Sequence, residues 1–189
     1  MARGRPGYHR MGAMSTSGDR FSTASPLRVT MVCTGNICRS PMAEAILTHE
    51  LLGTDLEGLV VVDSAGTHSY HVGEDADGRA REILAEGGYP ITHRARRFDP
   101  AWFADRDLIL AMDSGHLRIL RDLAARHGAD AAVVRQFRDF DPEGAGDVPD
   151  PYYETLDAYR LVRTMVERST PNLIAHLRDM VAADTQPAG

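Results

Sequence analysis

The segment V-C-T-G-N-I-C-R-S-P, residues 32–41, gathers two cysteines, a glycine and an arginine at the end of an apolar run. Cys33 and Cys38 are the only cysteines of the chain. They could form a disulfide, belong to a metal site, or be a nucleophile and its companion. Two cysteines this close do not make a secreted disulfide framework. A zinc site needs four clustered ligands, and no second cysteine or histidine pair lies nearby. The pattern favours a nucleophile.

Residues 33–39 lie between a predicted strand and a predicted helix, a position that suits an anion-binding loop. Backbone N–H groups converge in such a loop, and the helix adds its unpaired N–H groups and the positive end of its dipole. Gly35 permits backbone angles that a side chain would forbid, and Asn36 tolerates a left-handed conformation. Arg39 offers a planar fork to two phosphate oxygens. The same donors would favour a thiolate at Cys33, poised beneath a phosphorus atom.

Length and composition describe an ordinary globular protein and exclude several functions. The chain has 189 residues, enough for one domain with a real core, and a formal net charge of −6. That charge argues against broad nucleic-acid binding. No apolar run approaches the roughly 18 residues of a membrane span, and there is no secretory h-region. We expect a cytoplasmic protein with no nucleic-acid or membrane partner; export without a signal stays open.

Apolar patterns alternate between buried strands and amphipathic helices along the chain. The predicted strands are residues 29–32, 59–62, 108–111 and 131–134. The helical stripes cover residues 42–52, 76–84, 117–124 and about 155–181. Pro41 is expected at the first position of the first helix. Pro171 either kinks the last helix or starts a second segment capped by Ser169 or Thr170.

This alternation predicts an α/β fold with three layers, in which a central four-stranded parallel sheet is flanked by helices on both faces. Ligands of such sheets bind outside the carboxyl ends of the strands, where the 33–39 loop lies. The expected organisation is a disordered tail at residues 1–26, one domain at residues 27–183 and a flexible C-terminus at residues 184–189.

The C-x5-R spacing followed by Ser is the signature loop of the protein tyrosine phosphatases. The fuller string C-T-G-N-I-C-R-S-P-M-A-E, from Cys33, resembles the low-molecular-weight branch of that family. D-P-Y-Y at residues 150–153 resembles the late element that carries the general acid of this branch. D-S-A-G-T, H-V-G, H-R-A-R and A-M-D also resemble family segments, in the family's order. The resemblance covers about residues 27–181 and identifies the 27–183 domain as a phosphatase domain.

The resemblance implies a protein tyrosine phosphatase that needs no metal or cofactor and hydrolyses phosphotyrosine through a phosphocysteine intermediate. Cys33 would be the nucleophile, and Arg39 would bind the oxyanion. Asp150 would protonate the leaving phenolate and then activate water, aimed by Pro151, which holds the preceding residue extended. Asp147 is the rival carboxylate. The implied partner is a phosphotyrosine protein, and phosphate, sulfate or vanadate would be active-site ligands.

The other expected site residues surround the nucleophile. The phosphate-binding loop would be completed by Thr34, Gly35, Asn36, Ile37, Cys38 and Ser40. By resemblance, the Ser40 hydroxyl hydrogen-bonds within the loop and helps to keep Cys33 ionised, while Ser64 and His93 join Asn36 in holding the loop in a strained shape.

The substrate pocket is expected to be aromatic. Tyr152 and Tyr153 would stack on a phenyl ring, with Ile37 and Tyr70 on the opposing wall. The family often has a tryptophan near Tyr70, a departure that bears on substrate preference. Related enzymes that act on phosphoarginine tend to carry Thr at the position of Ile37, so Ile37 indicates a phosphotyrosine substrate.

Three further residues have less settled roles. Cys38 is either a small apolar filler or a redox partner, because in the family it can pair with the nucleophile under oxidation and protect it from irreversible oxidation. Asp113 is expected to be structural, near a strand end. His116 stands where the family often has Asn, and the sequence offers no mechanism for this change.

Other functions stay open. A phosphoarginine phosphatase is the first alternative. Arsenate reductases share the fold and the loop, but the thioredoxin-coupled type needs further downstream cysteines, and none follows Cys38. A non-catalytic anion-binding or redox module would keep the loop and lose the acid, so Asp150 counts against it.

Overall fold

The structure, a computed structural model, describes residues 25–184. The tail expected at residues 1–26 lies outside this range except for Ser25 and Pro26. The expected flexible C-terminus also lies outside it except for Asp184, which ends the last helix. No helix within the described range is long and apolar enough to cross a membrane.

Four parallel strands form the centre of the fold in the order β2-β1-β3-β4. Their bounds are Leu27–Cys33 for β1, Val60–Gly66 for β2, Leu108–Ala111 for β3 and Val134–Gln136 for β4. Side chains of the two central strands alternate between the faces of the sheet, as the period of two requires. Met31 and Leu110 enter one core, whereas Val32 and Ile109 enter the other.

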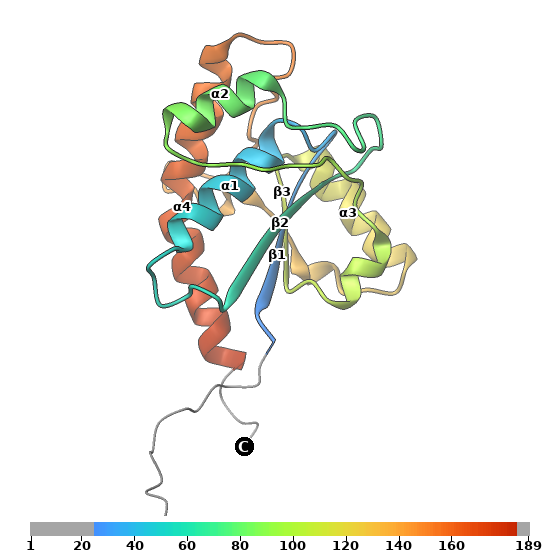
Figure 1. Ribbon diagram of the computed structural model, residues 1–189. Helices are drawn as coiled ribbons and strands as arrows, with labels where there is room; N and C mark the ends of the chain where they lie inside the picture. The colour runs from blue at the N-terminus through green and yellow to red at the C-terminus, as the bar shows by residue number, and fades with distance from the viewer. Residues whose placement is uncertain (1–24, 185–189) are drawn as a thin grey trace, which may run out of the picture.

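Helices cover both faces of this sheet (Figure 1). On one side lie α1 (Arg39–Leu51), α2 (Gly78–Glu86) and α4 (Leu156–Asp184). On the other side lie α3 (Ser114–Arg126) and a short 3-10 helix at Pro100–Ala104. The predicted three-layer α/β architecture is therefore confirmed.

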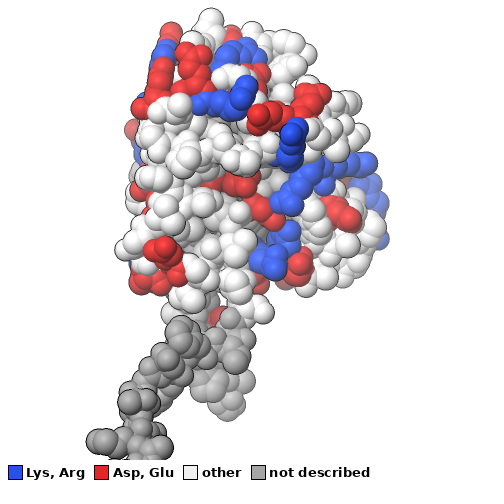
Figure 2. Space-filling model, viewed as in Figure 1, with Lys and Arg blue, Asp and Glu red and all other residues white. Residues whose placement is uncertain are grey.

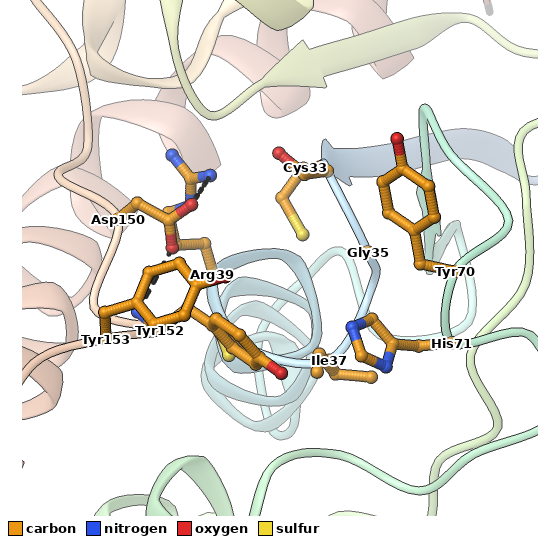
Figure 3. A pocket seen from close by; sticks show the side chains of 11 residues that line it. Cys33, Gly35, Ile37, Arg39, Tyr70, His71, Asp150, Tyr152 and Tyr153 are labelled. Carbon is orange, nitrogen blue, oxygen red and sulfur yellow. Dashed lines mark hydrogen bonds and ion pairs between the residues drawn. The ribbon is translucent and has the colours of Figure 1, made fainter.

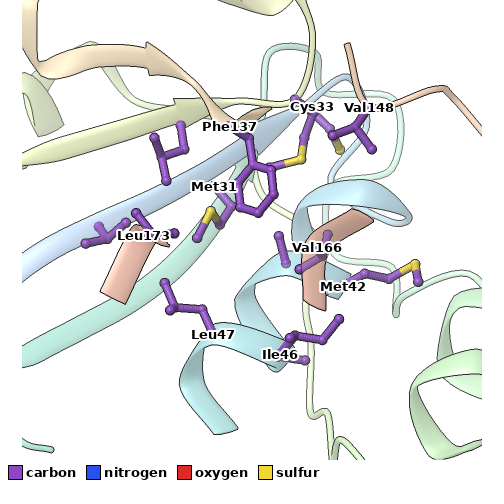
Figure 4. Packing of buried hydrophobic residues seen from close by; sticks show 14 of the residues in the cluster. Met31, Cys33, Met42, Ile46, Leu47, Phe137, Val148, Val166 and Leu173 are labelled. Carbon is purple, nitrogen blue, oxygen red and sulfur yellow. The ribbon is translucent and has the colours of Figure 1, made fainter. Parts of the chain in front are cut away.

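The larger core lies between the sheet and helices α1 and α4 (Figure 4). Leu47 of α1 and Val166 of α4 are fully buried in it together with Met31 of β1. Cys33 and Val148 belong to the same cluster. The floor of the loop after β1 therefore rests on the packed interior, which limits its movement.

The fourth strand differs from its prediction. Residues 131–133 form a 3-10 turn, and β4 begins only at Val134. The carboxylate of Asp130 accepts the N–H of Ala132 at 2.8 Å and turns the chain there. Val134 is fully buried, whereas Ala132 is exposed, so burial begins where the strand begins.

The two prolines are accommodated differently from the prediction. Helix α1 begins at Arg39, so Pro41 is its third residue; the first turn has no intrahelical acceptors for its N–H groups, and proline costs little there. Helix α4 runs without a break through Pro171. The hydroxyls of Ser169 and Thr170 donate to carbonyls four residues earlier, at 2.7 and 2.8 Å, so the predicted second segment with its own cap is wrong.

Charges of both signs lie side by side on the face shown in Figure 2. One ion cluster fastens the start of the 141–150 loop to α4. Asp141 accepts from Arg168 at 2.7 Å and from Arg138 at 2.9 Å. Hydrogen bonds from Arg168 lower the pKa of Asp141 to about 2. The carboxylate is therefore ionised and paired at neutral pH, which anchors one end of the loop that carries Asp150.

The core packing leads to a first prediction. Leu47→Ala removes a fully buried side chain of α1 and should lower the free energy of unfolding by about 2–5 kcal/mol, since the cavity adds to the lost transfer energy. Urea unfolding measures this. Leu52→Ala, at a position 60% exposed just after the same helix, should change it by less than about 0.5 kcal/mol. Equal losses in both variants would contradict the packing described here.

Candidate active site

The loop between β1 and α1 turns on Asn36. Its φ angle is 59°, and among residues 25–184 no other non-glycine residue has a positive φ. Gly35 permits such angles but is not among the glycines with positive φ. What Gly35 supplies is space: a Cβ there would lie 2.7 Å from Cδ2 of His71. The left-handed residue of the loop is thus Asn36, and glycine serves a close approach beside it.

The side chain and backbone of Asn36 are held from several directions. Its Nδ2 donates to Oγ of Ser40 at 2.9 Å and to Oγ of Ser64 at 2.7 Å. Its Oδ1 accepts the backbone N–H of Arg96 at 2.9 Å. Nε2 of His93 lies 2.7 Å from its carbonyl oxygen. The residues expected to support the loop, Ser40, Ser64 and His93, thus converge on Asn36.

The sulfur of Cys33 lies at the end of β1, facing the pocket shown in Figure 3. The residue is 3% exposed. Sγ lies 3.0 Å from Oγ of Ser40 and accepts the backbone N–H of Asn36 at 3.3 Å. The sulfur therefore accepts one hydrogen bond from the backbone of the loop and has a hydroxyl group beside it.

Cys38 has a different environment. Its Sγ lies 3.4 Å from the hydroxyl of Tyr159, beneath the first turn of α1. Burial raises the pKa of Cys38 to about 12, although the contact with Tyr159 opposes this. Cys38 is therefore a neutral thiol at neutral pH. Its pairing with Cys33 under oxidation stays a prediction.

Arg39 gathers the negatively charged side chains of the site. Its guanidinium is 3% exposed; Nη1 donates to Asp113 at 2.8 Å and to the carbonyl of Val148 at 3.1 Å. Nη2 donates to Asp150 at 2.8 Å (Figure 3). Within the described residues these are its hydrogen bonds. The Nε–H and one N–H of Nη2 are not used in these bonds.

The two candidate carboxylates occupy different places. Asp150 lines the same pocket as Cys33, and its side chain is 51% exposed. Asp147 instead accepts the N–H of Ser114 at 2.8 Å and Nε2 of Gln136 at 2.6 Å. Asp147 thus ties the 141–150 loop to the start of α3, and the geometry favours Asp150 as the acid.

The pocket above Cys33 has a volume of about 210 Å³. The four expected wall residues all line it, and Figure 3 shows Tyr152 and Tyr153 on one side of the pocket and Tyr70 on the other. His71 also lines it, and its ring lies 5.8 Å from that of Tyr152. The pocket joins a sulfur, a guanidinium and a carboxylate at its floor to aromatic rings at its mouth.

Residues that the sequence did not single out hold the acid-bearing loop. Arg79 of α2 donates to the carbonyls of Tyr152 at 2.8 Å and Glu154 at 3.0 Å. It also pairs with Asp77, whose N–H donates to the carbonyl of Ile37 in the phosphate-binding loop. Arg79 therefore links the two loops through α2. Its surface position in an amphipathic helix carried no signal of this role.

Gly66, which ends β2, was likewise missed. A Cβ at this position would lie 2.6 Å from the carbonyl oxygen of Thr34 and 3.1 Å from the backbone of Gly35. Both neighbours are backbone atoms of the phosphate-binding loop, which cannot swing aside as a side chain can. The motif D-S-A-G-T contains this glycine, and the motif was the signal available.

A family model described as low molecular weight phosphotyrosine protein phosphatase matches residues 28–183. The chain belongs to this family. The predicted resemblance is therefore confirmed. A relative from Streptomyces coelicolor, named low molecular weight protein-tyrosine-phosphatase, is 49% identical over 157 residues, which are 82% of this chain and 95% of the relative.

Solved structures of the family have the same fold. A protein tyrosine phosphatase from Entamoeba histolytica, with Hepes in its active site, matches with a TM-score of 0.76 and 32% identity over 82% of this chain and 98% of the other. A Drosophila arginine phosphatase matches with a TM-score of 0.74 and 29% identity over 79% and 97% of the two chains. The fold of the low-molecular-weight family thus serves both kinds of named phosphatase.

The contact at Gly66 gives a second prediction. Gly66→Ala should displace the backbone of Thr34 and Gly35. A displacement of about 1 Å at an active site can lower the reaction rate by about 10²-fold. We expect the dissociation constant of orthovanadate, measured by protection of Cys33 from iodoacetamide, to rise by at least about tenfold. Gly78→Ala is the matched control, since a Cβ there meets nothing within 4 Å. Unchanged vanadate binding in Gly66→Ala would contradict this role.

Proposed function

We propose that the chain is a metal-independent protein tyrosine phosphatase, which hydrolyses phosphotyrosine through a phosphocysteine intermediate. One observation carries the proposal: the sulfur of Cys33, the guanidinium of Arg39 and the carboxylate of Asp150 line one pocket whose mouth is aromatic. The membership in the low-molecular-weight family supports it. The substrate would be a protein that carries phosphotyrosine, and phosphate, sulfate or vanadate would occupy the same cradle.

Binding begins with the phosphate oxygens. Arg39 keeps its Nε–H and one N–H of Nη2 along one edge, a spacing that suits two oxygens of a phosphoryl group. The N–H groups of the loop and of the first turn of α1 supply further donors. Asp113 and the carbonyl of Val148 hold the opposite edge of the guanidinium. The arginine therefore binds the anion without losing its own support.

The first chemical step transfers the phosphoryl group to sulfur. The thiolate of Cys33 attacks phosphorus, the bond to the tyrosine oxygen breaks, and protonated Asp150 gives its proton to that oxygen. Charge spreads over the three equatorial oxygens in the transition state, where the loop donors and Arg39 stabilise it. Asp150 can leave Arg39 for the leaving oxygen because its side chain is half exposed.

The second step restores the enzyme. Asp150, now ionised, takes a proton from a water molecule, whose oxygen attacks the phosphocysteine as the sulfur–phosphorus bond breaks. The products are inorganic phosphate and the thiolate of Cys33. The positive potential that a metal would supply comes here from Arg39 and backbone N–H groups, and the proton is carried by a carboxyl group.

A phosphoarginine phosphatase is the second candidate, supported by the structural likeness to named arginine phosphatases. The lining of the pocket favours tyrosine. Tyr70, Tyr152 and Tyr153 present rings that stack on a phenyl group, and Ile37 is 6% exposed and apolar. Asp150 is the sole acidic residue among the lining residues of the described chain, so little there would compensate the charge of a guanidinium substrate.

The function is tested by comparing turnover of phosphotyrosine, phosphoserine and phosphoarginine peptides in the presence of EDTA. We expect phosphotyrosine to have the highest kcat/KM, by roughly 10- to 200-fold, because the ring fills an apolar pocket. Cys33→Ser should bind orthovanadate and turn over none of the three. Faster turnover of the phosphoarginine peptide would support the second candidate instead. Turnover by Cys33→Ser would show that Cys33 is not the nucleophile.

The choice of carboxylate gives a further prediction. Asp150→Ala should lower kcat on phosphotyrosine by roughly 10²–10⁴-fold, the usual contribution of a general acid. The loss should be smaller on para-nitrophenyl phosphate, whose leaving group needs less protonation. Asp147→Ala, which removes the contacts with Ser114 and Gln136, should lower kcat by the same factor on both substrates. The reverse pattern would show that Asp147 is the acid.

A further inference from the structure

His116 is a buried histidine that contacts the phosphate-binding loop from another element. It lies in the first turn of α3 and is 4% exposed. Its Nε2 lies 2.8 Å from Oγ1 of Thr34, the residue directly after Cys33. Thr34 in turn lines the pocket. A side chain from α3 therefore reaches the N-terminal end of the loop, within one residue of the sulfur.

The other side of the imidazole faces Asp113. Nδ1 lies 2.9 Å from Oδ1 of Asp113, although it makes no well-directed hydrogen bond there. The backbone N–H of His116 donates to the same oxygen at 2.8 Å. Burial raises the pKa of Asp113, but the adjacent imidazole and backbone N–H of His116, together with the charge of Arg39, outweigh this and hold the pKa well below its usual range. Asp113 therefore stays ionised beside the imidazole.

Asp113 also holds the guanidinium of the site. Its Oδ2 accepts Nη1 of Arg39 at 2.8 Å. The contacts thus run from Thr34 through His116 and Asp113 to Arg39, which joins the two ends of the phosphate-binding loop by way of α3. The backbone of the loop also connects Thr34 to Arg39. The loop and the contacts through His116 and Asp113 therefore form a closed ring.

We propose that His116 is a positioning residue, which through Thr34 and Asp113 keeps the N–H groups of the loop and the guanidinium of Arg39 in a constant relative arrangement. This inference rests on the proposed function and extends it to the geometry of the cradle. If the proposal holds, loss of this arrangement should weaken the binding of a transition-state-like anion more than that of a ground-state anion.

The contact with Thr34 can be tested by a double-mutant cycle. His116→Ala and Thr34→Val should each raise the dissociation constant of orthovanadate by about 3- to 10-fold, the effect of one lost hydrogen bond. The double variant should bind orthovanadate no more weakly than the weaker-binding single variant, because both substitutions remove the same contact. Effects that multiply would overturn the proposal.

Conservative substitutions separate positioning from packing. Gln places its amide near the position of Nε2, so His116→Gln should restore vanadate binding to within about twofold of the unsubstituted protein. Asn ends near the position of Nδ1 and cannot reach Thr34, so His116→Asn should bind as weakly as the alanine variant. Equal binding by the two variants would contradict the proposed contact, and this comparison serves if the alanine variant does not fold.

Two further readouts complete the experiment. In His116→Ala the loss of affinity for orthovanadate should exceed the loss of affinity for inorganic phosphate. General loosening of the fold would instead lower both affinities equally and lower the melting temperature. His127→Ala, an exposed histidine at the end of the same helix, is the matched control and should bind both anions normally. If the protein binds vanadate in this pattern but does not hydrolyse phosphotyrosine, the proposed function fails while the role of His116 stands.

Discussion

The site depends on keeping Asn36 in a left-handed backbone conformation between β1 and α1. That conformation turns the N–H of Asn36 toward the sulfur of Cys33. A non-glycine residue in this region costs free energy, and it persists where the surroundings over-determine it. Here the surroundings are the hydrogen bonds that Asn36 makes with Ser64, His93 and Arg96, which belong to β2 and the segment after α2. The anion cradle is therefore maintained from outside the loop.

A second constraint concerns charge. The protein carries a net charge of −6, yet its site must attract a dianion. A buried guanidinium is stable when it is paired, and Arg39 is paired with Asp113 and Asp150. The two partners differ in exposure, with side chains 23% and 51% exposed. The more buried one holds the arginine, and the more exposed one has room for the movement that the proposed acid role requires.

The topology explains why these groups meet. Cys33 ends β1 and Asp113 lies two residues after β3, and the two strands are parallel neighbours whose carboxyl ends share one edge of the sheet. The 141–150 loop crosses that edge because the N–H of Val148 donates to the carbonyl of Met112 at 2.8 Å. Ligand sites of open α/β sheets lie at such edges, and three distant segments of the chain assemble this one.

The sequence by itself predicted the α/β class and the family, because these follow from periodicity and from the local motifs around Cys33, Arg39 and Asp150, and it named those three side chains as the candidates for the reaction. Tertiary structure decided what depends on neighbours distant in the chain: that Asn36 rather than Gly35 is left-handed, and that His116 reaches the loop. Such choices could not be predicted from local pattern, since a backbone angle or a buried polar contact is selected by hydrogen bonds and space that appear only once separate elements have packed together.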